Sequence, residues 1–183
     1  MDTTTDRDLD QFLDDIKAAP RDAGPVVSII LRPGVDLREA VDEGVLTIED
    51  GLVGDDWRAR AGMASTAPRY ADTDSQLTLM STRVLAAICP DRSRWPLAGD
   101  QFLVDLDLSE ESLPPGTRLT MGDAEVEVTA LPHTGCAKFS ARFGSDALRW
   151  INNPTGRSLR MRGMYVRVVR GGSVRVGDVV RKA

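Results

Sequence analysis

The second half of the chain holds five short segments that are rich in β-branched residues and are separated by turn sequences. They are GDQFLVDLDL (99–108), TRLTMG (117–122), AEVEVTAL (124–131), MYVRVVRGG (164–172) and SVRVGDVVRK (173–182). Pro-Pro-Gly, Met-Gly-Asp and Gly-Gly stand between them and favour tight turns. Apolar and charged residues alternate in several segments, which predicts strands with one face in water. Short strands at regular spacing with few helices predict a mainly β fold, a closed or partly closed barrel.

The remaining elements are predicted from apolar spacing. An amphipathic helix is expected over 6–19, a buried strand over 25–31, weak helical turns in 34–46, a loop over 58–75, and a strand over 76–81 with a helix after it. Residues 138–151 have a helical pattern that Gly144 interrupts. We expect residues 1–24 to form an N-terminal helical extension and residues 25–183 to form one barrel domain.

Charge and targeting signals limit the functions that the chain can have. Its 23 basic and 28 acidic residues give a formal net charge of −5, which argues against nucleic-acid binding and against docking on an anionic membrane. No stretch approaches the roughly 20 apolar residues of a membrane span, and the acidic N-terminus MDTTTDRDLD is unlike a secretory signal. The prediction is a cytoplasmic protein whose two cysteines stay reduced, without a zinc site.

The segment PHTGCAKFSARFG (132–144) gathers His133, Cys136, Lys138 and Arg142 directly after an apolar strand. Cys136 stands where a helix should begin, and free backbone N–H groups and nearby cations there favour a thiolate. Three interpretations are compatible with this pattern: a nucleophile, a ligand for an anionic cofactor, and a buried thiol at a strand–helix junction. His133 could serve a Cys nucleophile as its base, but no third residue nearby in the sequence orients it. Cys89 is expected to be a small buried residue.

A second basic cluster, NNPTGRSLRMRG (152–163), contains Arg157, Arg160 and Arg162 after a Pro-Thr-Gly turn. Charged runs of this kind are usually solvated loops. Arginine is also suited to bidentate phosphate contacts. If this loop faces Cys136 across the barrel mouth, the two clusters form an anion pocket with a thiol at one end.

These two motifs resemble a known family. PHTGCAKFSARFG together with LRMRGMYVRVVRGGSVRVGDVV is similar to the signature of the MOSC domain, the molybdenum-cofactor sulfurase C-terminal family. GLVGDDW, QLTLMSTRVLAAI and the segment from Gly99 to Thr129 resemble earlier parts of that family in the same order. The resemblance runs from about Val26 to Val180 and implies a β-barrel of mixed strands with a few short peripheral helices.

The resemblance also implies a cofactor and a site. Cys136 maps onto the family's cysteine, which is thought to carry sulfur or to ligate the molybdenum of the pterin cofactor. Lys138, Arg142, Arg160 and Arg162, with Arg157 and His133 beside them, become candidates to hold the pterin phosphate and to shape its pocket. No pyridoxal phosphate is expected in this chain, since the aminotransferase-like domain of some relatives is missing from it.

The function implied is that of a molybdenum-cofactor-binding protein that either reduces N-hydroxylated substrates or passes on sulfur or cofactor. A small-molecule substrate and a separate electron-donor or sulfur-donor protein are the expected partners. A cofactor-dependent oxidoreductase and a sulfur carrier are both compatible with these residues. The alternative is a non-catalytic module that binds a pterin or another anion without molybdenum. Gly99-Asp100-Gln101 motivates it, because many small members have Gly-Glu-Asn there.

Overall fold

The computed structural model describes residues 8–59 and 73–183. Seven strands close into a barrel in the order β11-β7-β8-β9-β5-β6-β1, and β1 pairs with β11 to complete the ring. The barrel strands are β1 (Ala23–Leu31), β5 (Leu77–Ser81), β6 (Phe102–Val104), β7 (Arg118–Met121), β8 (Ala124–Val128), β9 (Met164–Arg170) and β11 (Val179–Lys182). Only β5 and β6 run parallel, so the barrel is mixed. The predicted mainly β barrel is confirmed.

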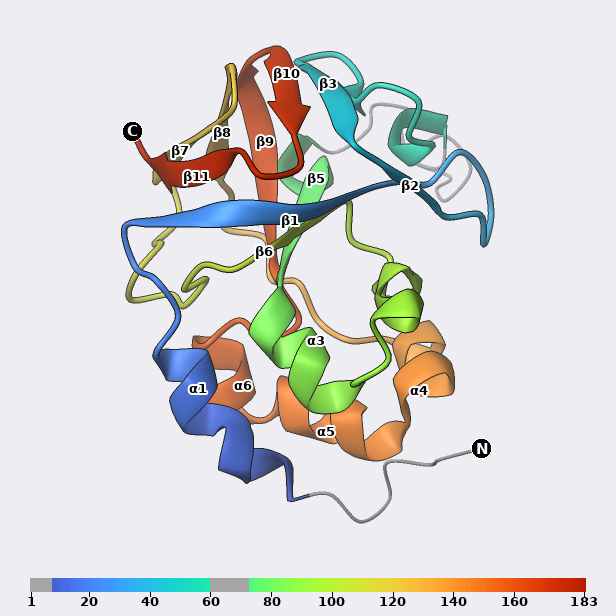
Figure 1. The fold of residues 1–183 in the computed structure, drawn as a ribbon, viewed down its shortest axis with the longest axis vertical. Coiled ribbons are helices and arrows are strands. Elements are labelled where there is room, and N and C mark those ends of the chain that lie inside the picture. The colour runs from blue at the N-terminus through green and yellow to red at the C-terminus, as the bar shows by residue number, and fades with distance from the viewer. Residues whose placement is uncertain (1–7, 60–72) are drawn as a thin grey trace.

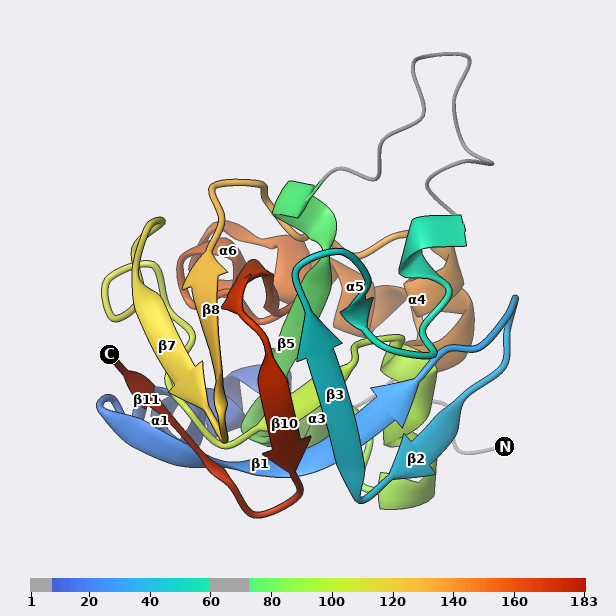
Figure 2. The same ribbon diagram turned by 90° about the horizontal axis from the view of Figure 1, so that it is seen from above.

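Two smaller features extend the barrel. β2 (Glu39–Val41) adds to the outer edge of β1. A separate sheet of β10 (Gly172–Arg175), β3 (Glu43–Thr47) and β4 (Gly51–Leu52) stands at the end of the barrel opposite the helices, as Figures 1 and 2 show. Leu46, Leu52 and Val174 from this sheet belong to the barrel's own core cluster, so the sheet covers that end of the core.

The helices gather on the other side of the molecule (Figure 1). They are η1 (Leu9–Phe12), α1 (Leu13–Lys17), α3 (Thr82–Ile88), η3 (Arg92–Ala98), α4 (Ala137–Phe143), α5 (Ser145–Asn152) and α6 (Pro154–Ser158). A one-turn 3₁₀ helix, η2 (Thr73–Ser75), precedes β5, and a helix that begins at Trp57 is described as far as Ala59.

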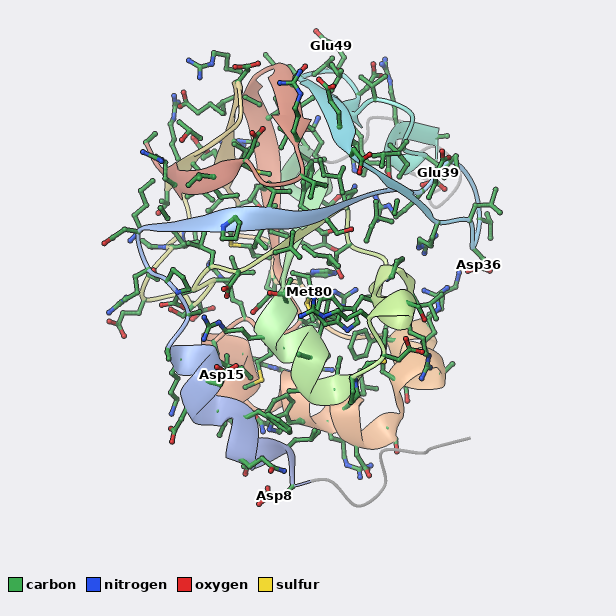
Figure 3. All side chains as sticks on the ribbon, viewed as in Figure 1. Asp8, Asp15, Asp36, Glu39, Glu49 and Met80 are labelled. Atoms are coloured by element: carbon green, nitrogen blue, oxygen red, sulfur yellow. The ribbon has the colours of Figure 1, made fainter. Side chains whose placement is uncertain are left out.

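Two apolar cores explain why some strands alternate and others do not. Successive residues of β1, β5 and β6 enter different cores: Ile29 and Leu79 face the barrel interior, while Ile30 and Met80 pack on the helices. Figure 3 shows Met80 between the barrel and α3. A strand that is buried on both faces reads as a continuous apolar run. In contrast, β8 and β9 send only one face into the barrel core, so every second residue is only half-buried.

Several predicted boundaries are wrong. The helical turns predicted over 34–46 are wrong for most of the segment. Residues 39–41 and 43–47 form β2 and β3, because β3 alternates exposed and buried residues and pairs with β10, and only 34–37 form a turn, with Leu37 N donating to Gly34 O at 3.1 Å. The expected strand 173–182 is two strands, separated at Gly177, whose φ of +93° turns the chain. Of the strand predicted over 99–108, only Phe102–Val104 form a strand, β6. It cannot begin earlier, because Gly99 has a left-handed backbone and Asp100 and Gln101 are buried in polar contacts.

Other expectations fare differently. The helical break at Gly144 is confirmed, and so is the burial of Cys89, whose exposed fraction is 4%. The Pro-Thr-Gly turn lies inside the short helix α6 instead of a loop. Most of the predicted 58–75 loop lies outside the described residues. The domain boundary after residue 24 stays a prediction; in the structure the N-terminal helices pack Leu9 and Ile16 into the helical core.

Candidate functional site

A pocket of about 380 Å³ opens where the end of β1, the loop before β6 and the chain between β8 and α4 meet. Its lining includes Cys136 and His133 from one segment, Arg32 after β1, and Arg162 and Tyr165 at the start of β9. Lys138, Arg142 and Arg38 also line it, so cationic side chains predominate among its polar groups. The two motifs that are distant in the sequence therefore meet here in part.

Cys136 presents its thiol at the mouth of this pocket. It is the residue directly before α4, and its side chain is exposed, whereas Cys89 is buried. Partial burial raises the pKa of the Cys136 thiol, but hydrogen bonds from the backbone N–H groups of Phe139 and Lys138 and the charges of Arg162 and Arg142 outweigh it. The pKa therefore lies below its usual value, and the sulfur is a better nucleophile and metal ligand than an ordinary thiol.

The side chain of Asn152 holds the segment that carries Cys136 in place. Its Oδ1 accepts from the N–H of Gly135 at 3.1 Å, and its Nδ2 donates to the carbonyl of Gly135 at 3.4 Å. A Cβ on Gly135 would come within 2.5 Å of Leu148 Cδ1, so a larger residue here would require the Leu148 side chain of α5 to move. The position of the thiol thus depends on α5.

Arg162 and Asp100 form a buried ion pair beneath the thiol. Arg162 Nη1 lies 2.8 Å from Asp100 Oδ2 and 3.0 Å from Oδ1, and its Nη2 donates to the carbonyl of Ala98 at 3.0 Å. The guanidinium carbon stands 5.0 Å from the ring centroid of Phe139, and Nε has no hydrogen-bond partner among the described residues. Burial raises the pKa of Asp100, and the charges of Arg162 and Arg32 oppose this effect.

His133 lies next to this pair. Its Nδ1 is 3.8 Å from Asp100 Oδ1 and has no hydrogen-bond partner in the described part of the chain. The imidazole ring packs on Tyr165 at a centroid distance of 4.4 Å. Burial, with the charges of Arg162 and Arg32, lowers the pKa of His133 well below its usual 6.5. His133 is therefore neutral at pH 7 and offers hydrogen bonds without a charge.

Arg32 and Asp55 form a second buried ion pair at the same pocket. Arg32 Nε and Nη2 each lie 2.8 Å from an oxygen of Asp55, and Arg32 Nη1 donates to the carbonyl of Gly99 at 2.9 Å. Arg32 and Arg162 thus donate to the consecutive carbonyls of Gly99 and Ala98. Planar guanidinium groups suit such bidentate contacts. The two pairs fix the loop before β6 as one wall of the pocket.

The outer rim of the pocket carries further cations. Arg142 Nη2 lies 2.8 Å and Lys138 Nζ 3.8 Å from Asp36 Oδ1, and Arg142 Nη1 donates to Leu97 O at 2.8 Å. Figure 3 shows Asp36 on the chain between β1 and β2, on the side that carries α4. Asp36 and Lys138 are exposed, so this ion pair is solvated and easily rearranged.

The sequence profile of the MOSC domain matches residues 70–181, more than half of the chain. The chain belongs to the MOSC domain family. No curated protein sequence matches it significantly. The match covers the Cys136 segment, Arg162 and the barrel strands from β5 to the middle of β11, so the pocket is largely built from the MOSC domain itself.

Solved structures show the same fold. YiiM from Geobacillus stearothermophilus superimposes with a TM-score of 0.60 at 17% identity, covering 87% of this chain and 75% of that one. The YuaD protein from Bacillus subtilis gives 0.58 at 18% identity, covering 86% and 94%. YiiM from Escherichia coli gives 0.57 at 21% identity, covering 88% and 69%. At these identities the likeness concerns the fold of the MOSC barrel.

The structure separates the residues that the sequence grouped. Cys136, His133, Lys138, Arg142 and Arg162 line one pocket, as the anion-pocket hypothesis requires. Arg157 and Arg160 line a different pocket, to which Cys136 does not contribute. Arg160 donates to Leu113 O at 2.6 Å, and Arg157 Nε to Asn152 O at 2.9 Å. Their expected role at the same cofactor as Cys136 is not supported by a shared cavity.

Sequence reasoning missed Arg32, which lines the Cys136 pocket, and the site roles of Asp55 and Asp100, which pair with Arg32 and Arg162. Each had a signal: Arg32 ends a buried strand, and Asp55 and Asp100 are charged residues after glycine turns. Gln101 is the second residue that differs from the Gly-Glu-Asn pattern of many small members. Its side-chain oxygen accepts from Thr78 N at 2.9 Å, and its Nε2 donates to Gln76 O at 3.4 Å. Gln101 uses its amide oxygen as an acceptor and its amide nitrogen as a donor. A carboxylate has no N–H to donate and could not make both contacts.

The Cys136 pocket offers one thiolate and several cationic side chains, which fits a metal that is bound by the thiolate and carried on an anionic organic cofactor. Among residues 8–59 and 73–183 no cluster of three His, Cys, Asp or Glu could hold a bare ion, so a metal here would need ligands that the cofactor brings. The unpartnered Nε of Arg162 and Nδ1 of His133 are polar atoms that such a group could satisfy. In the same described part of the chain, no helix is long and apolar enough to cross a bilayer.

Proposed function

We propose that this MOSC protein binds molybdenum cofactor through the Cys136 thiolate and uses it either to reduce N-hydroxylated substrates or to pass on sulfur or cofactor. One observation carries the proposal: an exposed thiol of lowered pKa stands at the mouth of a pocket whose polar lining is mainly cationic. A soft thiolate suits a metal that already has sulfur ligands. The family of the chain is associated with the same cofactor.

Each residue of the pocket has a distinct part in this proposal. Cys136 would ligate the metal. Lys138 and Arg142 both pair with the exposed Asp36, and Arg142 also donates to Leu97 O. They are the cations that can turn from Asp36 to a phosphate on the pterin. Arg162 and the neutral His133 would hydrogen-bond the pterin, since Nε and Nδ1 have no partner in the described chain. When bound, the cofactor would supply two-electron redox chemistry or a sulfur atom, and a separate protein would supply the electrons or the sulfur.

The test is the metal content of the full chain purified from a host that makes the cofactor. We expect molybdenum in the wild type and in Cys89→Ala, and loss of most of it in Cys136→Ala. Cys89→Ala is the matched control because it removes the other thiol, which is buried outside the pocket. Equal molybdenum in Cys136→Ala and wild type would contradict the role of the thiol.

A second measurement separates the catalytic proposal from a binding module. Reduction of an N-hydroxylated base with a reduced viologen dye as electron donor, absent in Cys136→Ala, would support an oxidoreductase. A chain that binds the pterin phosphate without molybdenum and turns over no base would establish the non-catalytic alternative instead.

A further inference from the structure

A second pocket, of about 440 Å³, lies beyond the Cys136 pocket. The chain after β8, the loop 108–115 and the α6–β9 connection enclose it. His133 and Arg162 line both pockets and so form the wall between them. Its volume lies within the range of small-molecule sites, roughly 300–1,000 Å³.

The second pocket combines an apolar surface with an excess of positive charge. Leu131, Pro132, Pro115, Ile151 and Met164 provide the apolar part, and Leu131 is 39% exposed. Its charged residues are Arg157, Arg160, Arg162 and Glu110. Asp100 compensates Arg162, and Glu110 can compensate one of the other two arginines, which leaves one positive charge without a counter-charge among the described residues that line the pocket.

The two remaining arginines, Arg157 and Arg160, make no ion pair with any described residue. Most arginines in the described ranges lie within 4.0 Å of a carboxylate, but Arg157 and Arg160 do not. Arg157 uses only Nε, on Asn152 O. Arg160 is half-buried, and its Nη1 donates to Leu113 O at 2.6 Å and Leu108 O at 3.4 Å. Burial lowers the pKa of Arg160, and Glu110 opposes the shift. Arg160 Nη1 also contacts Met164 Sδ at 3.6 Å, so its hydrogen-bond partners in the described chain are neutral. A half-buried cation with neutral hydrogen-bond partners favours an anion nearby.

The backbone conformation at Arg160 fixes the direction in which its side chain leaves the chain. Its φ is +47°, a left-handed conformation that is unfavourable for a residue other than glycine. Hydrogen bonds from Arg160 N to Arg157 O at 3.0 Å and from Gly163 N to Arg160 O at 2.7 Å hold the turn. The turn sets Arg157 and Arg160 on one pocket and Arg162 on the wall between the two.

We propose that the second pocket binds a small organic anion, a phosphate or carboxylate carried on a compact apolar body, independently of Cys136. Arg157 and Arg160 contact the anionic group, and Leu131 and Met164 contact the apolar body. Because His133 and Arg162 line both pockets, this ligand would lie next to the Cys136 pocket. The site is separate from the proposed cofactor site, so either can be present without the other.

The probe is phenyl phosphate, which combines an anionic phosphate with an apolar ring. Inorganic phosphate and phenol are the controls, because each carries only one of these two groups. Titration of the full chain, followed by amide chemical shifts in NMR, should give saturable changes at residues 129–134 and 156–164. We expect phenyl phosphate to bind at least about tenfold more tightly than either half, because only it uses both parts of the pocket. Changes confined to residues 136–142, or equal affinity for inorganic phosphate, would overturn the proposal.

Two variants make the test specific. Arg157→Gln should weaken phenyl phosphate binding about tenfold, since it removes a charge-assisted hydrogen bond, with little change in Tm. Arg149→Gln is the control, because Arg149 is exposed on α5, pairs with Asp146 and lines neither pocket. Cys136→Ala should bind the probe as the wild type does. Loss of molybdenum with retained probe binding would count against the proposed function alone. Retained molybdenum without probe binding would count against this site alone.

Discussion

Nδ1 of His133 lies 3.8 Å from Oδ1 of Asp100, while Arg162 bonds both oxygens of that carboxylate. The histidine therefore stands beside a buried ion pair without completing a hydrogen bond to it. No neighbour of His133 in the sequence could orient it, and the barrel brings Asp100 to it from 33 positions upstream. This relationship makes His133 a neutral member of the pocket wall, and it has consequences for stability.

The stability of the protein should fall as the pH drops below the ordinary pKa of histidine. The native pKa of His133 is well below 6.5, because burial and the charges of Arg162 and Arg32 disfavour the imidazolium. Between these two values the unfolded chain binds more protons than the native one, so the free energy of unfolding decreases by up to about 1.4 kcal/mol per pH unit. Urea unfolding from about pH 7.5 to 5.5 checks this slope.

His133→Gln provides the comparison for that slope. The variant keeps a polar side chain but does not titrate, so its free energy of unfolding should depend less on pH over the same range. An identical slope in wild type and variant would show that His133 is not buried in its neutral form.

Breaking the Arg162–Asp100 pair should be costly. Arg162→Met leaves Asp100, which is fully buried, without its positively charged partner, and we expect a loss of about 3–5 kcal/mol in the free energy of unfolding. The double variant Asp100→Leu with Arg162→Met removes both charges and should lose much less. Arg175→Met is the surface control, because the Arg175–Glu43 pair is exposed and contributes about 0–1 kcal/mol. Similar losses in all three would contradict a buried ion pair.

Cys136 should react with iodoacetamide at a lower pH than an ordinary thiol. Its pKa is below the usual value, because the N–H groups of Phe139 and Lys138 and the charges of Arg162 and Arg142 outweigh the effect of burial. Alkylation rates measured against pH by mass spectrometry should place the midpoint below that of a free cysteine peptide. Arg142→Gln should move the midpoint upward, and Cys89 should stay unmodified in the folded protein.

Gly163 should tolerate no side chain. Its φ is +91°, and a Cβ would stand 2.3 Å from the carbonyl oxygen of Leu79 in β5. Gly116 has nearly the same φ, +88°, but nothing within 4 Å of its Cβ position. Both alanine variants share the cost of the left-handed conformation, so Gly163→Ala should lose about 1–3 kcal/mol more than Gly116→Ala. Thermal or urea unfolding of the two variants measures the difference, and equal losses would argue against the close approach.

The sequence was most informative where local chemistry and tertiary structure agree. The apolar runs of β1 and β5, the alternation of β8 and the glycine at 144 led to the barrel and to the helical break, because a two-residue period and a left-handed glycine are local signals. It was misleading over most of 34–46, where the short strands β2 and β3 depend on pairing with β1 and β10.

The sequence by itself determined the barrel strands and the reactive cysteine that precedes a helix in an otherwise thiol-poor chain. Only the tertiary structure decided which arginines share its pocket. Arg32 meets Asp55 across 23 positions and Arg162 meets Asp100 across 62, while Arg157 and Arg160 turn to a second cavity five or fewer residues away from Arg162. The reason is physical: a buried charge must find its partner wherever the fold places one, and sequence spacing carries no information about that contact.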